Sequence, residues 1–377
     1  MLIRKNNMRV LVTGSRGFIG KNLVVRLEEQ SDTEIFHFSR GNSVNNLEEI
    51  VKNCDYVVHL AGENRPKDIA DFAVVNSDLT NSLCEAIRNT SRNIPLILAS
   101  STQASMDNPY GESKLSAESV VKKFSKDTGN DVIIYRLPGV FGKWCKPNYN
   151  SVVATFCHNI ANDLPIQIND PSLQIRLVYV DDVVTDFIDT LQLMDKGINL
   201  RKISPDYSIT LGELAQQIKL FKNCRIDLVS ERVGSGLIRA LYSTYISYLP
   251  PVKFVYDLQR HSDERGVFVE MLKTQDSGQF SFFTAHPGVT RGGHYHHSKT
   301  EKFLVIKGLA QFGFRNIVTN EIFEVFTSGD KSQVVETVPG WTHDITNVGD
   351  EELVVMLWAN EIFNKEQPDT YASKILD

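Results

Sequence analysis

A tyrosine and a lysine lie four residues apart in the segment YGESK, as Tyr110 and Lys114. If this segment begins a helix, residues i and i+4 share a face, so the ammonium lies beside the phenol. A nearby positive charge lowers the pKa of a phenol and lets it exchange a proton with a substrate oxygen. The segment ASST, residues 99–102, closes a predicted strand just upstream and supplies hydroxyl groups. The pair alone is a weak signal, because this spacing also arises by chance in helices.

Three glycines, Gly14, Gly17 and Gly20, lie between an apolar run and a helix-like segment in the sequence TGSRGFIG. Glycine permits a tight turn and a close backbone approach, so a dinucleotide pyrophosphate can lie against the N-terminus of the helix. The alternative is a purely structural glycine turn. The context of strand, turn and helix favours a dinucleotide-binding site.

The second predicted strand ends in Ser39 and Arg40. An NAD enzyme usually presents an acidic residue to the ribose hydroxyls at this point. A hydroxyl and a guanidinium suit a 2′-phosphate instead, and Arg16 in the glycine turn is placed to assist. We therefore expect NADPH rather than NADH, the alternative being that either arginine is a solvated surface charge.

Histidines with the spacing of metal ligands lie in the last third of the chain, in the segment GHYHHSKTE. His294 and His296 are two residues apart, so on a strand they point to the same face. Glu301 follows across a predicted turn, and His343 comes later in PGWTH. Imidazoles and a carboxylate that converge inside a β-structure bind zinc or another divalent first-row ion. We expect zinc; the alternative is a polar cluster without metal.

The elements that carry these residues change character along the chain. Up to about Pro250, apolar strands alternate with helical patterns, which indicates a parallel sheet covered by helices on both faces. After Pro250 the chain consists of evenly spaced short strands with Gly, Pro and Asp turns, which is typical of an all-β barrel or sandwich. We expect two domains, residues 1–248 and 249–377.

The composition narrows the choice of partners. The chain has 377 residues and a formal net charge of −6, with no basic run, which argues against a nucleic-acid partner. Five scattered cysteines argue against a disulfide framework. The apolar run at the start is too short for a signal or a membrane segment. We expect a cytoplasmic protein without a membrane span.

Over roughly residues 8–240 the chain resembles the extended short-chain dehydrogenase/reductase family, which has a Rossmann-type, doubly wound parallel sheet. The likeness rests on TGSRGFIG, DYVVHLAG, ASST, YGESK, YRLPGVFG and VYVDDV. It implies that Ser101 and Tyr110 contact the reacting oxygen, with Tyr110 as the general acid/base. Lys114 would bind the nicotinamide ribose. The resemblance also implies three cofactor contacts after the third strand: Leu60, Ala61 and Gly62.

Two departures from this family bear on the chemistry. Thr102 and Gln103 stand where dehydratases carry Asp-Glu, so simple hydride transfer is the better interpretation. Gly139 stands where an asparagine is common, so a substrate contact expected there is in doubt. Arg176, in LQIRLVYVDD, matches an arginine that often binds a nucleotide diphosphate; a structural ion pair is the equal alternative.

Over roughly residues 252–365, the spacing H-x-H-x4-E-x6-G with a later P-G-x-x-H-x3-N is similar to the cupin signature. The segments DERGVFVE and TRGGHYH resemble the cupin-like sugar-nucleotide 3,5-epimerases, in which the histidine of R-G-x-H removes a proton beside a ketone. His294 would be that histidine. Because it is also a predicted metal ligand, the base stays open, and Lys302 is another candidate for proton transfer.

Taken together, the two halves resemble the bifunctional capsular-polysaccharide enzymes of the CapF type over nearly the whole chain. GKWCKPNYNSVVATFC, LYSTYISYLP and HYHHSKTEKFLV carry this likeness. It implies a UDP-linked 4-keto-6-deoxy-N-acetylhexosamine as substrate, with C3 epimerised in a cupin barrel and the C4 ketone then reduced with NADPH. The implied product is UDP-2-acetamido-2,6-dideoxy-L-talose, on the route to UDP-N-acetyl-L-fucosamine.

Because both families commonly self-associate, we expect a homodimer. Two other functions fit the same motifs. One is a 4-keto-sugar reductase whose cupin serves only folding or oligomerisation, and the other is an NADPH-binding sensor with a ligand-binding cupin. The pair of Tyr110 and Lys114 argues against a sensor, which needs no proton donor.

Overall fold

The computed structural model describes residues 8–64, 68, 72–366 and 368–376. The chain divides into two compact units. The amino-terminal unit comprises Met1–Ile218 and Ser235–Leu249, and the β-rich unit comprises Lys219–Gly234 and Pro250–Asp377. Residues 219–234 lie with the β-rich unit because strand β10 (Val229–Ser230) pairs with β12 (Gly266–Thr274), whereas a boundary at 248/249 assigns them to the first domain.

A six-stranded, wholly parallel sheet forms the centre of the amino-terminal unit, in the order β2-β1-β3-β4-β5-β8. The strand bounds are β1 Met8–Thr13, β2 Thr33–Phe38, β3 Tyr56–His59, β4 Leu96–Ser101, β5 Val132–Leu137 and β8 Ile198–Arg201. The strand order reverses between β1 and β3, so a ligand crevice is expected at the carboxyl ends of these strands. The predicted Rossmann-like parallel sheet is confirmed.

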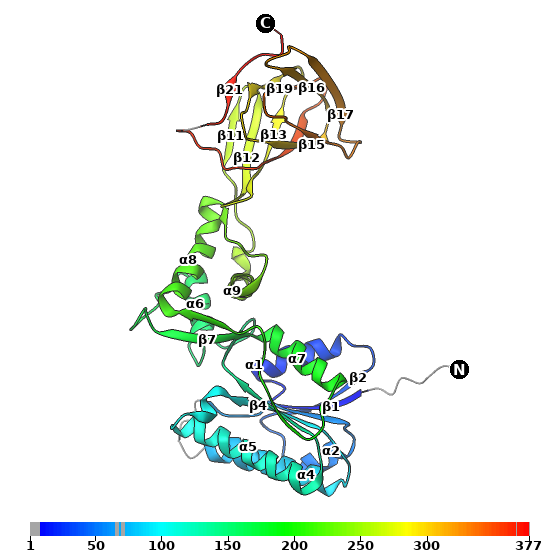
Figure 1. Ribbon diagram of the computed structural model, residues 1–377, viewed down its shortest axis with the longest axis vertical. Coiled ribbons are helices and arrows are strands. Elements are labelled where there is room, and N and C mark those ends of the chain that lie inside the picture. Colours follow the sequence, from blue (N-terminus) through cyan, green and yellow to red (C-terminus); the bar gives the residue numbers. More distant parts are fainter. Residues whose placement is uncertain (1–7, 65–67, 69–71, 367, 377) are drawn as a thin grey trace, which may run out of the picture. The chain divides into compact units, whose positions relative to one another are not determined.

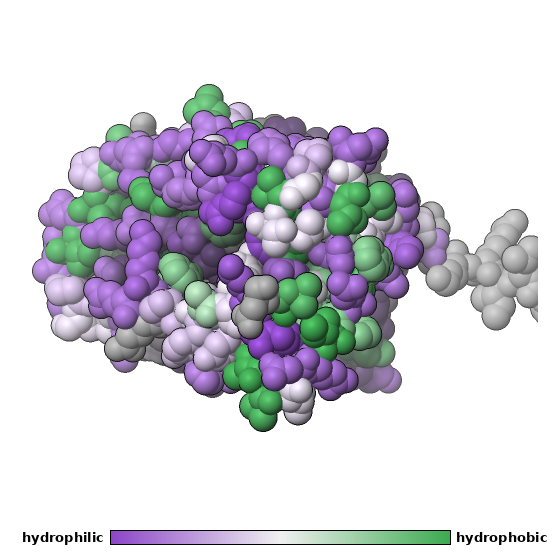
Figure 2. Space-filling model, turned by 90° about the horizontal axis from the view of Figure 1, so that it is seen from above, coloured by the Kyte–Doolittle hydropathy of each residue, from purple (hydrophilic) through white to green (hydrophobic). Residues whose placement is uncertain are grey.

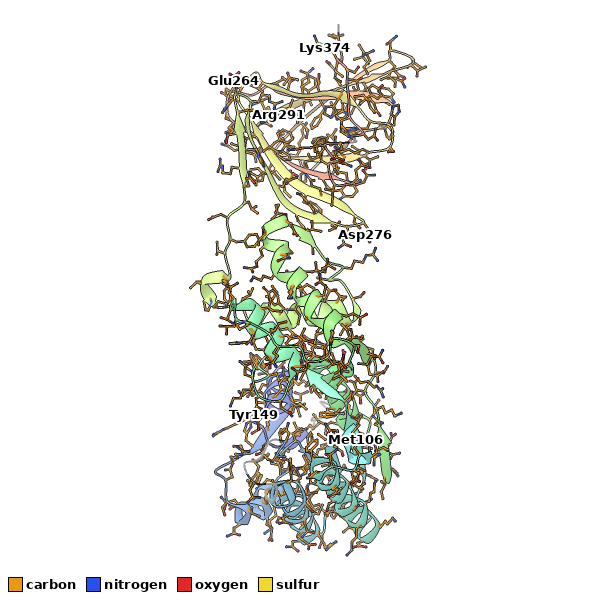
Figure 3. All side chains as sticks on the ribbon, turned by 90° about the vertical axis from the view of Figure 1, so that its left-hand side faces the viewer. Met106, Tyr149, Glu264, Asp276, Arg291 and Lys374 are labelled. Atoms are coloured by element: carbon orange, nitrogen blue, oxygen red, sulfur yellow. The ribbon has the colours of Figure 1, made fainter. Side chains whose placement is uncertain are left out.

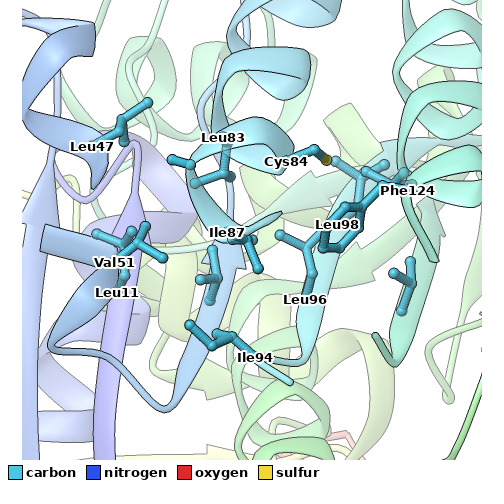
Figure 4. Close-up of a cluster of buried hydrophobic side chains, with 14 of the residues drawn as sticks. Leu11, Leu47, Val51, Leu83, Cys84, Ile87, Ile94, Leu96, Leu98 and Phe124 are labelled. Atoms are coloured by element: carbon cyan, nitrogen blue, oxygen red, sulfur yellow. The ribbon is translucent and has the colours of Figure 1, made fainter. Parts of the chain in front are cut away.

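Helices cover both faces of this sheet, with α2, α4 and α5 on one face and α1 and α7 on the other (Figure 1). Their bounds are α1 Phe18–Glu28, α2 Leu47–Lys52, α4 Leu79–Asn89, α5 Pro109–Thr128 and α7 Val180–Gln192. A cluster of buried apolar side chains joins α2, α4 and α5 to the sheet and includes Leu11, Leu47, Leu83, Leu96 and Phe124 (Figure 4). Burial on both faces explains why the strands are continuous apolar runs.

Helix α5 has clear start and stop signals. The Asn108 side chain accepts a hydrogen bond from the Gly111 amide at 2.9 Å, and Pro109 occupies the first turn. The helix ends at Gly129, whose φ of +77° is left-handed. These caps fix the first turn of α5, which carries Tyr110.

The remaining elements before Pro250 are smaller. They are the 3₁₀ turns η1 Val44–Asn46 and η3 Thr102–Ser105, the π-helical η2 Ala73–Asp78, the helices α6 Val152–Ala161, α8 Leu211–Asp227 and α9 Gly236–Ile246, and the strands β6 Gly139–Phe141, β7 Gln174–Tyr179 and β9 Tyr207–Thr210. The last three strands form a second, small sheet in the order β6-β7-β9.

The β-rich unit contains two sheets, preceded by the 3₁₀ turn η4 Pro251–Lys253. The first sheet has the order β10-β12-β13-β20-β15-β18, with β11 also pairing with β12, and the second has the order β17-β16-β19-β14-β21. The bounds are β11 Arg260–Asp263, β13 Gly278–Ala285, β14 Thr290–Tyr295, β15 Glu301–Lys307, β16 Leu309–Asn316, β17 Ile322–Ser328, β18 Val334–Glu336, β19 Trp341–Asn347, β20 Leu353–Ala359 and β21 Tyr371–Ala372.

One apolar core is shared by these two sheets. Phe283 and Phe303 come from the first sheet, and Phe312 and Ile345 from the second, and all four are buried. The predicted β-rich carboxy-terminal region is therefore confirmed. The closed barrel is not found among the described residues, because strand pairing links each sheet only within itself.

The molecular face in Figure 2 is largely hydrophilic, with hydrophobic side chains in several separate groups. Scattered exposed apolar side chains are normal for folded proteins. Across the described part of the chain, none of the helices combines the length and the apolar character needed to cross a membrane.

Candidate active site and candidate metal centre

The glycine-rich turn lies between β1 and α1, against the end of β3. Gly14 has a φ of +67°, and a Cβ on it would lie 2.7 Å from the backbone nitrogen of Ala61. A Cβ on Gly20 would lie 2.2 Å from the carbonyl oxygen of Gly14. The backbones approach too closely for any side chain at these two positions. Gly17 closes the turn by donating its amide to the Gly14 carbonyl at 2.8 Å, and Arg16 is exposed at its tip.

The loop after β3 is tied to the end of β1. Thr13 Oγ1 accepts hydrogen bonds from the amides of Leu60 and Ala61, each at 3.2 Å. It also pairs with His59 Nδ1 at 2.6 Å, and burial lowers the pKa of His59 to about 3, so this ring is neutral. The three predicted cofactor positions after β3 therefore belong to a loop with a fixed backbone beside the glycine turn.

Arg40 lies just past the end of β2 and forms an ion pair with Glu63. The Arg40 side chain is 85% exposed, whereas that of Glu63 is 10% exposed and also accepts a hydrogen bond from Tyr149 Oη at 3.2 Å. The ion pair joins the ends of β2 and β3 across the end of β1, which lies between them. Ser39 begins the turn that follows β2, and its amide donates a hydrogen bond to Asn42 Oδ1 at 2.9 Å.

Tyr110 and Lys114 lie on one side of α5, as their spacing predicts. Lys114 Nζ is 5.9 Å from the centre of the Tyr110 ring and donates to the Ala99 carbonyl at 3.4 Å. Burial lowers the pKa of Lys114 to about 8. Burial raises the pKa of Tyr110 above its usual value, and a hydrogen bond with Ser101 partly offsets this rise. Ser101 rather than Lys114 is therefore the neighbour that favours the phenolate form of Tyr110.

Gly62 is the contact between the β3 loop and this lysine. A Cβ on Gly62 would lie 2.9 Å from both Lys114 Nζ and Asn76 Oδ1, so a side chain there would displace the ammonium from this position. Asn76 Oδ1 accepts from the Glu63 amide at 2.8 Å, and Asn76 Nδ2 donates to Ser113 Oγ at 3.0 Å. Asn76, which links the β3 loop to α5, and the buried Glu63 were not predicted as functional residues. Their contacts are with residues distant in sequence, which only the tertiary fold brings together.

Arg176 lies on β7 and is 63% exposed. It forms an ion pair with Asp206. The structure therefore places it as a surface ion pair and brings it into no cluster with Ser101, Tyr110 and Lys114 among the described residues.

In the β-rich unit the four predicted metal ligands converge. One potential ligand atom from each of His294, His296, Glu301 and His343 lies within 4.8 Å of the others. The imidazole centres are 5.0 Å apart for His294 and His296, 4.6 Å for His294 and His343, and 5.2 Å for His296 and His343. Strands β14 and β19 pair directly and carry His294 opposite His343, while Glu301 begins β15.

The electrostatics of this group suit a cation. Burial raises the pKa of Glu301, but His296, His343 and Lys299 outweigh it and hold this pKa well below the usual range. Burial, with a smaller contribution from His343, lowers the pKa of His294 to about 4, so this imidazole is neutral. Among the described residues, neither ring nitrogen of His343 has a hydrogen-bond partner of ordinary geometry, although Nε2 lies 3.3 Å from Glu301 Oε2. Unpartnered buried nitrogens next to a carboxylate fit a metal-binding role.

Two lysines flank Glu301 and behave differently. Lys299 is 9% exposed, and its Nζ lies 3.1 Å from Glu301 Oε1. Lys302, the predicted alternative for proton transfer, forms an exposed ion pair with Glu336. The reason is the two-residue period of a strand: Glu301 points inward, so its neighbour in β15 points outward. Lys299 precedes the strand in a turn, and no periodicity predicted its position.

Two cavities of about 160 and 210 Å³ adjoin the metal-ligand group, and both are lined by Phe268, His294, Glu301 and Leu357. Arg291 lines the first cavity and lies in the β-rich unit in Figure 3. Its buried Nη2 has no hydrogen-bond partner in the described structure. Lys299 lines the second cavity. Each of the two cavities beside the candidate metal centre is therefore lined by one positive side chain.

Comparison with known proteins gives a consistent result for both units. The sequence model of the NAD dependent epimerase/dehydratase family matches residues 10–203, and that of the polysaccharide biosynthesis C-terminal domain matches residues 261–371. A UDP-2-acetamido-2,6-beta-L-arabino-hexul-4-ose reductase of Pseudomonas aeruginosa is 58% identical over 98% of this chain and 99% of its own.

A structural relative also spans both units. The crystal structure of the capsular polysaccharide assembling protein CapF from Staphylococcus aureus matches with a TM-score of 0.90 and 41% identity, covering 97% of this chain and 100% of that one. A dTDP-4-dehydro-6-deoxyglucose reductase of Escherichia coli is 27% identical, covering 58% of this chain and 83% of its own.

Proposed function

The chain belongs to the NAD dependent epimerase/dehydratase family, and we propose that it is an NADPH-dependent nucleotide-sugar reductase that also epimerises its substrate. Its substrate is a UDP-linked 4-keto-6-deoxy-N-acetylhexosamine. The observation that carries the reductase proposal is the cluster of Ser101, Tyr110 and Lys114 beside a glycine turn. The 58% identity to a UDP-linked hexul-4-ose reductase over both whole chains supports the choice of substrate.

In the reduction, NADPH supplies a hydride to C4 of the sugar. Ser101 and Tyr110 bind the C4 oxygen, and Tyr110 gives it a proton, so the ketone becomes a hydroxyl. The Lys114 ammonium lies beside Gly62 of the β3 loop. From that position it would bind the nicotinamide ribose. Arg40, Ser39 and Arg16 hold the 2′-phosphate, and charge-assisted hydrogen bonds from arginine suit that group.

The remaining cofactor contacts come from the glycine turn and the β3 loop: Gly14, Gly17, Gly20, Leu60, Ala61 and Gly62. The glycines of the turn let a pyrophosphate approach the backbone closely at the N-terminus of α1, where the first helical amides would bind it. Arg176 is assigned to the nucleotide diphosphate of the substrate, in place of its present partner Asp206.

The β-rich unit, which we assign to the cupins, carries the epimerisation. His294, His296, Glu301 and His343 hold a divalent ion, zinc by preference, because three imidazoles and one carboxylate are donors that zinc accepts. An ion held by these residues would supply polarisation of the C4 ketone oxygen, which would make the neighbouring C3 hydrogen more acidic.

Lys299 adds a second positive charge where negative charge develops on the substrate. It lines the cavity beside Glu301 and is largely withdrawn from water, where a preorganised charge acts most strongly. C3 inversion therefore needs both the metal ligands and Lys299. Reduction at C4 then gives UDP-2-acetamido-2,6-dideoxy-L-talose, which serves the supply of UDP-N-acetyl-L-fucosamine in the cytoplasm. The active protein is a homodimer.

The reductase proposal is tested by offering the UDP-linked 4-keto sugar with NADPH and, separately, with NADH. We expect stoichiometric loss of NADPH absorbance and formation of a 4-hydroxy sugar, with slower turnover of NADH. Absence of NADPH oxidation by purified protein at high substrate concentration would refute it. A monomer in light scattering would refute the homodimer.

A further inference from the structure

The last described residues run beside the stretch that carries two of the metal ligands. We call residues 369–374 the C-terminal segment and residues 293–299 the ligand stretch. Ser373 donates its amide to the Gly293 carbonyl at 3.0 Å. Within β21 and β14, Ala372 pairs with His294 and Tyr371 with Tyr295. The two segments are therefore held together in register, antiparallel to one another.

Asp369 continues this register past the end of β21. Its carboxylate accepts hydrogen bonds from three successive backbone amides, those of His297 at 2.8 Å, Ser298 at 2.7 Å and Lys299 at 2.8 Å. The Ser298 hydroxyl adds a fourth at 2.8 Å. The backbone carbonyl oxygen of Asp369 forms a hydrogen bond with His296 Nδ1. Asp369 thus holds residues 297–299, the central part of the turn between His296 and Glu301.

The contact with His296 has a chemical consequence. A carbonyl oxygen can only accept, so His296 Nδ1 carries a proton, and Nε2 is the ring nitrogen left to face a metal ion. That Nε2 lies 3.2 Å from Glu301 Oε2, on the side of the other ligands. Hydrogen bonds of this kind fix the orientation and the tautomer of metal-binding histidines.

The hydrogen bond between Asp369 and the Lys299 amide also affects Glu301, through the Lys299 side chain. Asp369 fixes the backbone of Lys299, whose Nζ meets Glu301 Oε1 at 3.1 Å. The two oxygens of Glu301 are thereby divided, Oε2 toward the histidines and Oε1 toward the lysine.

The C-terminal segment is itself anchored. Arg315 Nε donates to the carbonyl oxygen of Lys374, the residue labelled at the end of this segment in Figure 3, at 3.0 Å. Thr342, the residue before His343 in β19, donates its hydroxyl to Ser373 Oγ at 2.8 Å. The segment therefore has fixed contacts on β16 and β19 from which Asp369 can hold the ligand stretch.

We propose that Asp369 is a positioning residue of the metal centre, through which the C-terminal segment sets the affinity for the ion. This inference rests on the metal centre of the proposed function. A role in sheet stability alone does not account for it, because Asp369 lies outside β21 and, among the described residues, its carboxylate accepts hydrogen bonds from the turn at 297–299 and from no strand.

The test compares zinc affinity in the full-length wild type, Asp369→Asn and Asp369→Ala, measured by competition with a chromogenic chelator. Asparagine keeps the shape but turns one acceptor oxygen into a donor that faces backbone amides. We expect about 10–100-fold weaker zinc binding in both variants. Hydrogen exchange of the amides of residues 297–299 should accelerate. Asp330→Asn, in an exposed turn after β17, removes a carboxylate elsewhere and should leave both measurements unchanged.

Hydrogen exchange of the core-strand amides of β15 and β20 checks that the β-rich unit of each variant is folded, and Ser298→Ala supplies a milder change if it is not. Zinc affinity within about twofold of the wild type in folded Asp369 variants would overturn the inference. Failure of the wild type itself to bind zinc, cobalt or nickel would refute the metal centre of the proposed function, a result obtained before any variant is compared.

Discussion

Lys114 Nζ lies 5.9 Å from the centre of the Tyr110 ring, one turn further along α5, with Gly62 immediately beside the ammonium. The lysine is buried, whereas Tyr110 is half-buried. The arrangement keeps a cation next to a phenol without a direct hydrogen bond between them. It leaves the phenol free to bond to Ser101 and to a substrate oxygen.

Replacing the phenol should remove the proton donor and little else. Tyr110→Phe keeps the ring that packs 5.7 Å from Phe72, so the fold is preserved. We expect the rate of NADPH oxidation with the 4-keto sugar to fall about 10²–10⁴-fold, the usual contribution of general acid catalysis. NADPH affinity, followed by its fluorescence, should stay within about twofold of the wild type. An unchanged rate would exclude Tyr110 as the acid.

The lowered pKa of Lys114 predicts a pH dependence of cofactor binding. The buried ammonium titrates near pH 8 rather than near its ordinary 10.5, so it is charged below pH 8 and neutral above it. From pH 7 to pH 9 the charged fraction falls from about nine-tenths to about one-tenth. NADPH binding that uses the ammonium should therefore weaken over this range. In Lys114→Met the NADPH affinity should be lower than in the wild type and nearly independent of pH over this range. A pH dependence like that of the wild type would contradict the assignment of the titration to Lys114.

Arg40 should determine the preference for NADPH over NADH. A hydrogen bond between charged groups contributes about 1.5–3 kcal/mol, or roughly 10–100-fold in affinity. We expect Arg40→Ala to weaken NADPH binding by such a factor and to affect NADH little. Arg26→Ala, which breaks an exposed ion pair with Glu29 on α1, is the matched control. Equal losses for both cofactors in Arg40→Ala would exclude contact with the 2′-phosphate.

The part of the site that lies on regular elements could be predicted from the sequence. Helix periodicity brings Tyr110 and Lys114 together, and strand periodicity puts His294 and His296 on one face. Glu63 and Asp369 could not be predicted, because their partners are distant in sequence: Arg40 lies 23 residues from Glu63, and His297 lies 72 residues from Asp369. Only the tertiary fold creates these pairs. The parallel sheet was predictable from its apolar runs, whereas the pairing of the later strands into two sheets depends on register.

The two lysines next to Glu301 give a sharp comparison. Lys299→Met should retain zinc yet slow deuterium exchange at C3 of the sugar by about 10²–10³-fold, the effect of removing one preorganised charge. Lys302→Met removes an identical charge from the outer face of β15. In this variant we expect deuterium to enter C3 of the sugar at the wild-type rate. Both variants are followed by NMR of the sugar, with zinc content measured on the same samples. The reverse pattern would assign the role to Lys302.

The central claim is that the two units perform two separate steps on one sugar. The most direct measurement offers the UDP-linked 4-keto-6-deoxy-N-acetylhexosamine in heavy water, with and without NADPH, and follows C3 and C4 by NMR. We predict deuterium at C3 without NADPH and a C4 alcohol only with it. His294→Ala and Glu301→Gln should lose the exchange while Tyr110→Phe keeps it. Oxidation of NADPH without any exchange at C3 would contradict the account and leave a reductase alone.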